Sequence, residues 1–260
     1  LNTRATGSAQ FTDTLFFQRS AAMFAFQFGK GDDGRDIGNE IRTRMGPSLA
    51  IALPVFVIGL LVNITFALLM VFFRATYLDL WGVVLCVVLM SISGLFYIIA
   101  GQYFIAKLWN LLPISGYAGG INGLKFILLP VLVSVVAGIG SGSRWYRTIF
   151  LEEIGKDYVR TAQAKGLGGW ATILKHQLRN ALIPIVTIMG IQLGGMIGGT
   201  VLIESIFVIP GMGNLMITAI KGKDYMVVEN GVFLIAVAVA LCNLAVDLLY
   251  GVIDPRIRDQ

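Results

Sequence analysis

Charged residues are scarce in this 260-residue chain: Asp, Glu, Lys and Arg make up 13% of it, whereas hydrophobic residues make up 56%. Soluble domains of average composition contain about a quarter charged residues, which cover their surface. The shortage of charge therefore argues against a soluble enzyme, a disordered chain and a fibrous protein. The chain also contains 31 glycines. Excess glycine together with excess aliphatic residues is typical of packed transmembrane helices.

Histidine, cysteine and the common catalytic motifs are almost absent. The single histidine, His176, excludes a metal cluster built from histidines. The two cysteines, Cys86 and Cys242, lie inside apolar runs, where packing is the expected role. The sequence has no P-loop, no G-x-S-x-G and no H-E-x-x-H motif. We therefore expect that the chain is not an enzyme, with no catalytic residue, metal site or cofactor of its own.

Five apolar stretches are long enough to cross a membrane, which takes about 20 mostly apolar residues. They cover approximately residues 48–73, 80–106, 126–143, 181–203 and 231–253. The sequence thus predicts an all-α, polytopic membrane protein whose transmembrane domain extends over residues 48–253.

Basic residues indicate the orientation of these spans. The loop 144–180 is rich in Lys and Arg, and Arg74 and the tail 254–260 add more on the same side. The opposite loops contain Lys107, Lys221 and Lys223. Because cytoplasmic loops carry an excess of Lys and Arg, we expect the first group to be cytoplasmic. The segments 1–47 and 204–230 are then external, and an additional span is expected ahead of Leu1.

The large cytoplasmic loop has the pattern of two helices separated by glycines. Leu151, Ile154, Tyr158 and Ala162 recur at helical spacing, and Gly166 is placed to end that helix in a left-handed conformation. A second apolar stripe then leads into the fourth span. Periodicity alone fits equally well with an amphipathic pair lying on the membrane surface.

Three blocks of the chain resemble a known transporter family. The loop segment DYVRTAQAKGLGGWATILKHQLRNALIP (157–184) is similar to the EAA loop of binding-protein-dependent ABC transporter permeases, especially the dipeptide/oligopeptide/nickel subfamily. The segments GGTVLIESIFVIPGMGNLMITAI (198–220) and DLLYGVIDPRIR (247–258) resemble the same subfamily. Arg160, Thr161 and Ala162 stand where the general pattern has Glu-Ala-Ala, as in the peptide-type form of the loop.

The resemblance implies a type I ABC importer permease fold with six spans in the full family and a mechanical role for the loop. A separate subunit would hydrolyse ATP, and the loop would transmit its motion to the membrane helices. The residues that the resemblance assigns to this contact are Tyr158, Arg160, Thr161, Ala162, Lys165, Gly166 and Leu167.

The same resemblance implies the partners, the substrate and the location. It predicts a second homologous permease, ABC ATPase subunits, an extracytoplasmic binding protein and a peptide substrate, within the cell membrane of a prokaryote. No nucleic acid is expected as a partner. Nickel or a nickel chelate is the alternative substrate. An ATP-independent channel or receptor-like membrane protein is the alternative of another class, but it leaves the helix–glycine–helix loop unexplained.

The fourth span carries small residues at intervals of four, which allow close helix approach. They serve either tight packing or a gate wall along the transport pathway, and Gln192 lies among them as a polar candidate for the pathway. The glycines considered for this role are Gly190, Gly194, Gly195 and Gly198.

Two carboxylates near the ends of the predicted spans are expected to have different environments. Asp247 lies inside the fifth span, where a carboxylate is costly, and we expect either a functional role or a structural ion pair near Asp254 and Arg256. Glu204 follows the fourth span and is expected to be solvated. A turn at 210–213 is expected after it, and the segment 214–230 is expected to fold back as an external helix.

Overall fold

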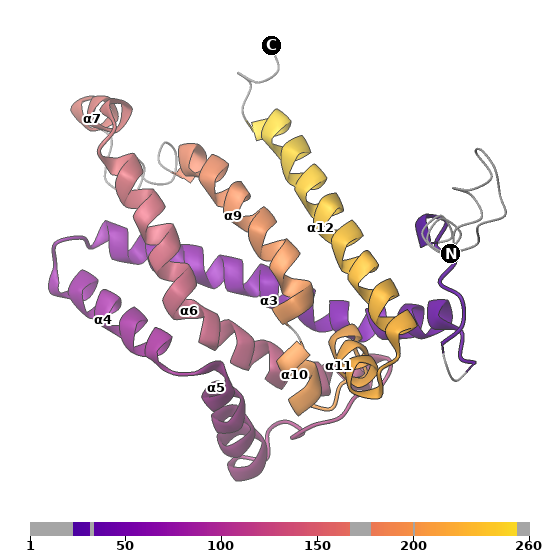
Figure 1. Cartoon of the computed structure of the whole chain (residues 1–260). Coiled ribbons are helices and arrows are strands. Elements are labelled where there is room, and N and C mark those ends of the chain that lie inside the picture. Colours follow the sequence, from indigo (N-terminus) through magenta and orange to yellow (C-terminus); the bar gives the residue numbers. More distant parts are fainter. Residues whose placement is uncertain (1–22, 32–33, 167–177, 200, 254–260) are drawn as a thin grey trace, which may run out of the picture.

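The computed structural model describes residues 23–31, 34–166, 178–199 and 201–253 (Figure 1). These residues form helices, and the only extended pairing among them is an isolated bridge between Lys30 and Asp36. The expected all-α fold class is confirmed for this part of the chain.

The first long helix, α3 (Ile37–Phe72), begins well before the predicted span at 48–73. The Asp36 carboxylate caps it by accepting a hydrogen bond from the backbone N–H of Asn39 at 3.1 Å. At about 1.5 Å per residue, this helix is roughly 54 Å long, whereas the hydrocarbon core of a membrane is about 30 Å thick. Its polar first turns therefore extend beyond the apolar part.

The second predicted span, 80–106, is not one straight helix. It consists of α4 (Tyr77–Ser91), α5 (Gly94–Gly101) and a π-helical turn at Gln102–Leu108, with a bend of 89° between α4 and the segment that begins at Gly94. Ile92 and Ser93 adopt extended conformations at the bend. The apolar composition runs through this point without a change, so hydropathy alone does not reveal the break.

The helix α6 (Leu124–Ile154) also exceeds its predicted span, because it continues past Ser143 into the expected loop. By length and composition, three helices of the described residues can cross a membrane, or four if the bent pair counts as one span. The prediction of five spans stays a prediction. The remaining α-helices are α7 (Asp157–Ala164), α9 (Leu178–Gly199), α10 (Val201–Ile206), α11 (Met212–Gly222) and α12 (Tyr225–Ile253).

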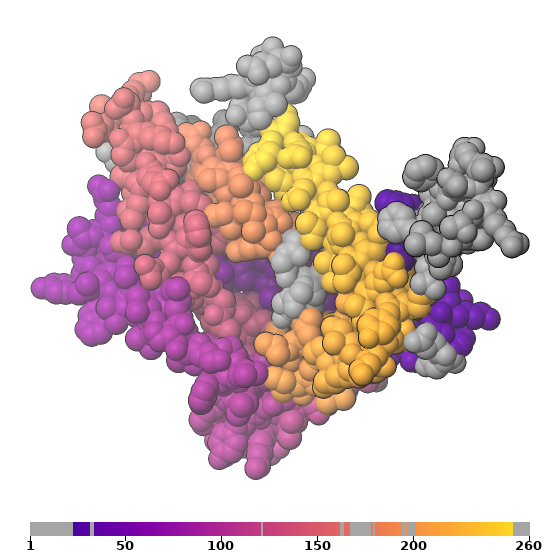
Figure 2. Space-filling model, in the orientation of Figure 1, coloured from indigo at the N-terminus to yellow at the C-terminus, as the bar shows by residue number. Residues whose placement is uncertain are grey.

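Helix α6 lies at the centre and packs against α3, α4, α5 and α9, while α12 packs along α9 (Figures 1 and 2). Glycines allow the closest approaches on α6. A Cβ atom on Gly140 would lie 2.6 Å from the Cys86 carbonyl oxygen of α4, and one on Gly142 would lie 2.4 Å from the Asn63 amide nitrogen of α3. Side chains at these two positions would push the helices apart.

The helix ends divide into two groups. Helix α7, the start of α9 and the end of α12 lie at one end of the molecule, whereas α10, α11 and the start of α12 lie at the other (Figure 1). This arrangement suits the expectation that the loop 144–180 and the segment 204–230 lie on opposite sides of a membrane.

Candidate functional site

The helix predicted through Leu151, Ile154, Tyr158 and Ala162 is divided in the structure, because Leu151 and Ile154 belong to the end of α6. The second part is α7, a two-turn helix that follows α6 after a short break. The backbone N–H of Lys165 donates to the Thr161 carbonyl oxygen at 3.1 Å, which closes the last turn. Gly166 then has a φ of +82°, in the left-handed region that favours glycine. The predicted glycine end of this helix is confirmed.

A buried carboxylate holds α7 against α6. Glu153, in the last turn of α6, is 6% exposed. Lys156 forms an ion pair with one of its oxygens, and the Tyr158 hydroxyl donates a hydrogen bond to the other. The Tyr158 hydroxyl also interacts with Asn180, at the start of α9. Tyr158 therefore joins α7 to the end of α6 and lies near the start of α9, a role that the sequence pattern did not indicate.

The environment of Tyr158 keeps its hydroxyl protonated. Burial, followed by the hydrogen bond to Glu153, raises the pKa of Tyr158 from 10.0 to about 12. A pKa raised by folding means that the protonated form stabilises the fold. This contribution is complete below pH 10 and is lost as the pH rises through about 12, so the hydroxyl is a donor throughout the physiological range.

We expect Tyr158→Phe to loosen α7 without unfolding the protein. The change removes one hydrogen-bond donor from Glu153, while Lys156 remains. The free energy of local unfolding of α7 should therefore fall by about 1 kcal/mol, which is a roughly fivefold larger population of the unfolded helix. Hydrogen–deuterium exchange of residues 155–166 should become faster by about that factor. Tyr225→Phe, at an exposed tyrosine of α12, is the matched control. Equal exchange in both variants would show that the hydroxyl does not hold the helix.

The other predicted coupling residues face outward or lie outside the described residues. Arg160, Thr161 and Lys165 are exposed, and the Thr161 hydroxyl donates to the Asp157 carbonyl oxygen at 2.9 Å. The side chain of Ala162 and the whole of Leu167 lie outside the described part of the chain. Helix α7 is thus held on one side by Tyr158 and presents basic side chains on the other.

Two of the predicted pathway residues, Gln192 and Gly190, have different surroundings in the structure. Gln192 is exposed on α9 and lines a cleft of about 440 Å³ between α3, α6 and α9. Gly190 is buried instead, and a Cβ atom there would lie 2.5 Å from Val246 of α12, which indicates a packing role. Gly194, Gly195 and Gly198 lie in α9, but their surroundings are outside the described part.

Of the three polar residues predicted near the inner end of the fifth span, only Asp247 is described. Its side chain is exposed on α12. Asp254 and Arg256 lie outside the described residues, so an ion pair among these groups stays a prediction.

An ion pair that the sequence pattern missed joins α4 to α6. Arg147 donates to both carboxylate oxygens of Asp79, at 3.0 and 2.8 Å, and Asp79 is only 9% exposed. The sequence pattern placed Arg147 in a loop. Tyr146 and Phe150 lie four positions apart on either side of Arg147. This helical spacing of large side chains beyond Ser143 is the signal that α6 continues through Arg147.

The expectation that Glu204 is solvated is wrong, because this side chain is fully buried. The Ser48 hydroxyl of α3 donates to Glu204 Oε1 at 2.6 Å, and the backbone N–H of Asn214 donates to Oε2 at 3.1 Å. The same Ser48 hydroxyl accepts the backbone N–H of Met212 at 2.7 Å. Glu204 and Ser48 together cap the start of α11, where backbone N–H groups favour a negative charge.

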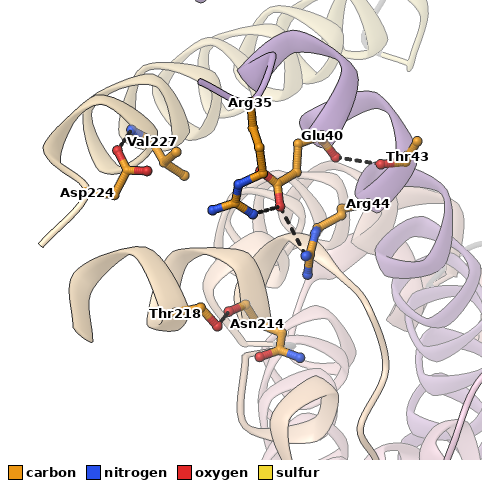
Figure 3. A network of polar contacts seen from close by, with 8 residues as sticks. All are labelled: Arg35, Glu40, Thr43, Arg44, Asn214, Thr218, Asp224 and Val227. Carbon is orange, nitrogen blue, oxygen red and sulfur yellow. Dashed lines mark hydrogen bonds and ion pairs between the residues drawn. The ribbon is translucent and has the colours of Figure 1, made fainter. Parts of the chain in front are cut away.

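A network of polar contacts lies where α11 meets the starts of α3 and α12 (Figure 3). Arg35 and Arg44 both contact Glu40, at 3.2 and 3.1 Å, beside the start of α11. Asp224 caps α12 by accepting the backbone N–H of Val227 at 3.2 Å. The helix predicted over 214–230 differs in the structure: α11 begins at Met212, inside the predicted turn, and ends at Gly222, whereas residues from Tyr225 on belong to α12. Helix α11 packs between the starts of α3 and α12.

Solved structures with a similar fold include the methionine ABC transporter MetNI in inward-facing conformations. One of its chains has a TM-score of 0.69 and 15% sequence identity, and the match covers 83% of this chain and 96% of that chain. At this identity the likeness concerns the fold alone. The fold is therefore that of a type I ABC importer permease, as the sequence predicted.

Sequence comparisons identify relatives among bacterial permeases. The dipeptide transport system permease protein DppB of Escherichia coli is 44% identical over 140 residues, which are 54% of this chain and 41% of the relative. The di/tripeptide transport system permease protein DppB of Pseudomonas aeruginosa is 38% identical over 191 residues, 69% of this chain and 56% of the relative. A peptide permease protein of Brucella suis is 33% identical over 224 residues, 84% of this chain and 70% of the relative.

The first two of these relatives are matched over about half of their length or less. A family match, however, covers most of the chain, from residue 48 to residue 259. It includes the cleft, α7, the buried Glu204 and α11. The chain belongs to the family of binding-protein-dependent transport system inner membrane components.

Proposed function

We propose that this chain is a permease subunit of an ATP-driven importer of di- or oligopeptides. It forms half of the pathway through the cell membrane of a prokaryote, and it performs no covalent chemistry and holds no cofactor. A separate ATPase subunit binds ATP. The other partners are a second homologous permease and an extracytoplasmic binding protein.

The placement of α7 is the observation that carries this proposal. The helix is fixed to α6 by Tyr158 and Glu153, and Tyr158 also reaches Asn180 of α9. Its outer side chains, Arg160 and Lys165, are exposed. A partner that moves this short helix would therefore move the ends of α6 and α9 together, which is the requirement for coupling ATP hydrolysis to a membrane pathway.

The coupling contact is proposed to use the residues of α7 and of the turn that follows it. Tyr158 positions the helix, whereas the exposed side chains meet acidic groups of the ATPase. The proposed contact residues are Arg160, Thr161, Ala162, Lys165, Gly166 and Leu167.

The substrate class follows from the names of the relatives, which are dipeptide, di/tripeptide and peptide permeases. These names support a peptide as the substrate of this chain. Nickel is the alternative substrate, and the transport experiment distinguishes it from a peptide.

The test is transport by the reconstituted complex. Proteoliposomes would contain this chain within the full permease, its partner permease, the ATPase subunits and the binding protein. We expect ATP-dependent uptake of radiolabelled dialanine that requires the binding protein. Uptake of nickel without dialanine uptake would identify the alternative substrate, and dialanine uptake without ATP would overturn the ATP-driven mechanism.

A further inference from the structure

The cleft between α3, α6 and α9 has the size and lining of a small-ligand site. Its volume of about 440 Å³ falls within the roughly 300–1,000 Å³ usual for ligand pockets. The neutral polar residues Asn63, Ser134, Ser141 and Gln192 lie along it, from three different helices. None of the described residues that line it is charged.

The α6 wall of this cleft is formed partly by small residues. Gly138, Ser141 and Gly142 lie three and four positions apart and therefore on one face of the helix. Asn63 packs directly on this face, with its amide nitrogen 2.4 Å from where a Cβ of Gly142 would lie. The Ser143 hydroxyl donates to Asn63 Oδ1 at 3.0 Å, which fixes the orientation of the amide.

A second observation concerns the side chain of Gln192 on the opposite wall. The Tyr146 hydroxyl is fully buried and has no hydrogen-bond partner at normal geometry among the described residues. Gln192 is the side chain close enough to influence it. A buried hydroxyl without a partner costs about 1–3 kcal/mol. A rotation of Gln192 toward Tyr146 would satisfy this hydroxyl and turn the amide away from the cleft.

We propose that this cleft is a transit site in which Asn63, Ser141 and Gln192 hydrogen-bond the backbone of a peptide during transport. This inference rests on the proposed peptide-importer function. Peptides of different sequence share backbone amides, which neutral amides and hydroxyls can pair with in either direction. The uncharged lining avoids holding acidic or basic peptide side chains tightly, and passage requires binding weak enough for release.

The same walls connect the transit site to the coupling helix. Helix α6 carries Ser141 and ends at Ile154, and α9 begins at Leu178 and carries Gln192. Tyr158 of α7 hydrogen-bonds Glu153 at the end of α6 and lies near Asn180 at the start of α9. Movement of α7 would therefore change the separation of the two walls, and turning Gln192 toward Tyr146 would withdraw one of the peptide's hydrogen-bond partners.

The test measures the accessibility of one cleft position in the reconstituted complex. Ser141→Cys would be introduced after Cys86 and Cys242 of this chain are replaced by serine. Labelling of this chain by a membrane-impermeant thiosulfonate is followed by mass spectrometry, with ATP and the binding protein present. Dialanine at a concentration that saturates uptake should slow labelling at least about twofold, because half-occupancy of the site halves the fraction of free thiol.

Val136→Cys provides the matched control, because this residue is 40% exposed on α6 but does not line the cleft. Its labelling should not respond to dialanine. Dialanine uptake without protection of Ser141→Cys, or with equal protection of Val136→Cys, would overturn the transit site and leave the importer function intact. Absence of dialanine uptake by the complex with unmodified cysteines would overturn both.

Discussion

Replacement of Gly166 by valine is expected to uncouple transport from ATP hydrolysis while the protein remains folded. At a φ of +82° a β-branched side chain is strained by about 1–3 kcal/mol, which is roughly 5- to 150-fold in the population of the native turn. Among the residues that the structure describes, no heavy atom lies within 4 Å of the place that a Cβ would take, so the expected penalty is that of the backbone conformation. The membrane helices are unchanged, so insertion should survive.

Gly155→Val is the control for this change. Gly155 lies at the other end of α7 with a φ of −71°, which any residue adopts. Among the described residues, a Cβ there would meet the Glu152 carbonyl oxygen at 3.8 Å and nothing nearer. The measurement is peptide-stimulated ATP hydrolysis together with retention of the ATPase on pull-down. We expect stimulation to fall much further with Gly166→Val than with Gly155→Val. Equal stimulation would show that the glycine turn is not the coupling hinge.

Local patterns explain why α7 and its glycine end could be predicted from the sequence. The apolar spacing of Tyr158 and its neighbours defines a helix, and a glycine after such a helix often adopts a left-handed conformation. Both signals lie within a few residues of each other. The membrane character follows in the same way from long apolar stretches, which require no knowledge of their neighbours in space.

Features that depend on distant residues could not be predicted. The bend at Ile92 and Ser93 interrupts a stretch whose composition does not change. Asp79 and Arg147 are 68 positions apart, and nothing in either segment indicates that they pair. Glu204 follows an apolar span like any solvated carboxylate, and only the contact with Ser48, 156 positions away, shows that it is buried.

The second large effect concerns Glu204. Its replacement by alanine removes two hydrogen bonds at the start of α11 and leaves the backbone N–H of Asn214 without its acceptor. Loss of a helix cap and of a buried acceptor together costs about 3 kcal/mol. We expect the thermal midpoint of the purified protein to fall by on the order of 10 °C. Glu229→Ala, at an exposed glutamate of α12, should leave the midpoint nearly unchanged.

A double-mutant cycle with Ser48→Ala tests whether the two side chains act as one cap. Ser48 both donates to Glu204 and accepts the backbone N–H of Met212, so each single change disturbs the network that the other uses. The effects of contacting residues commonly deviate from additivity by about 0.5–3 kcal/mol. We therefore expect Ser48→Ala to cost clearly less when Glu204 is already alanine. Additive effects would mean that α11 is fixed by its apolar contacts with Ile37, Ile41 and Val227 alone, and that the buried carboxylate does not cap it.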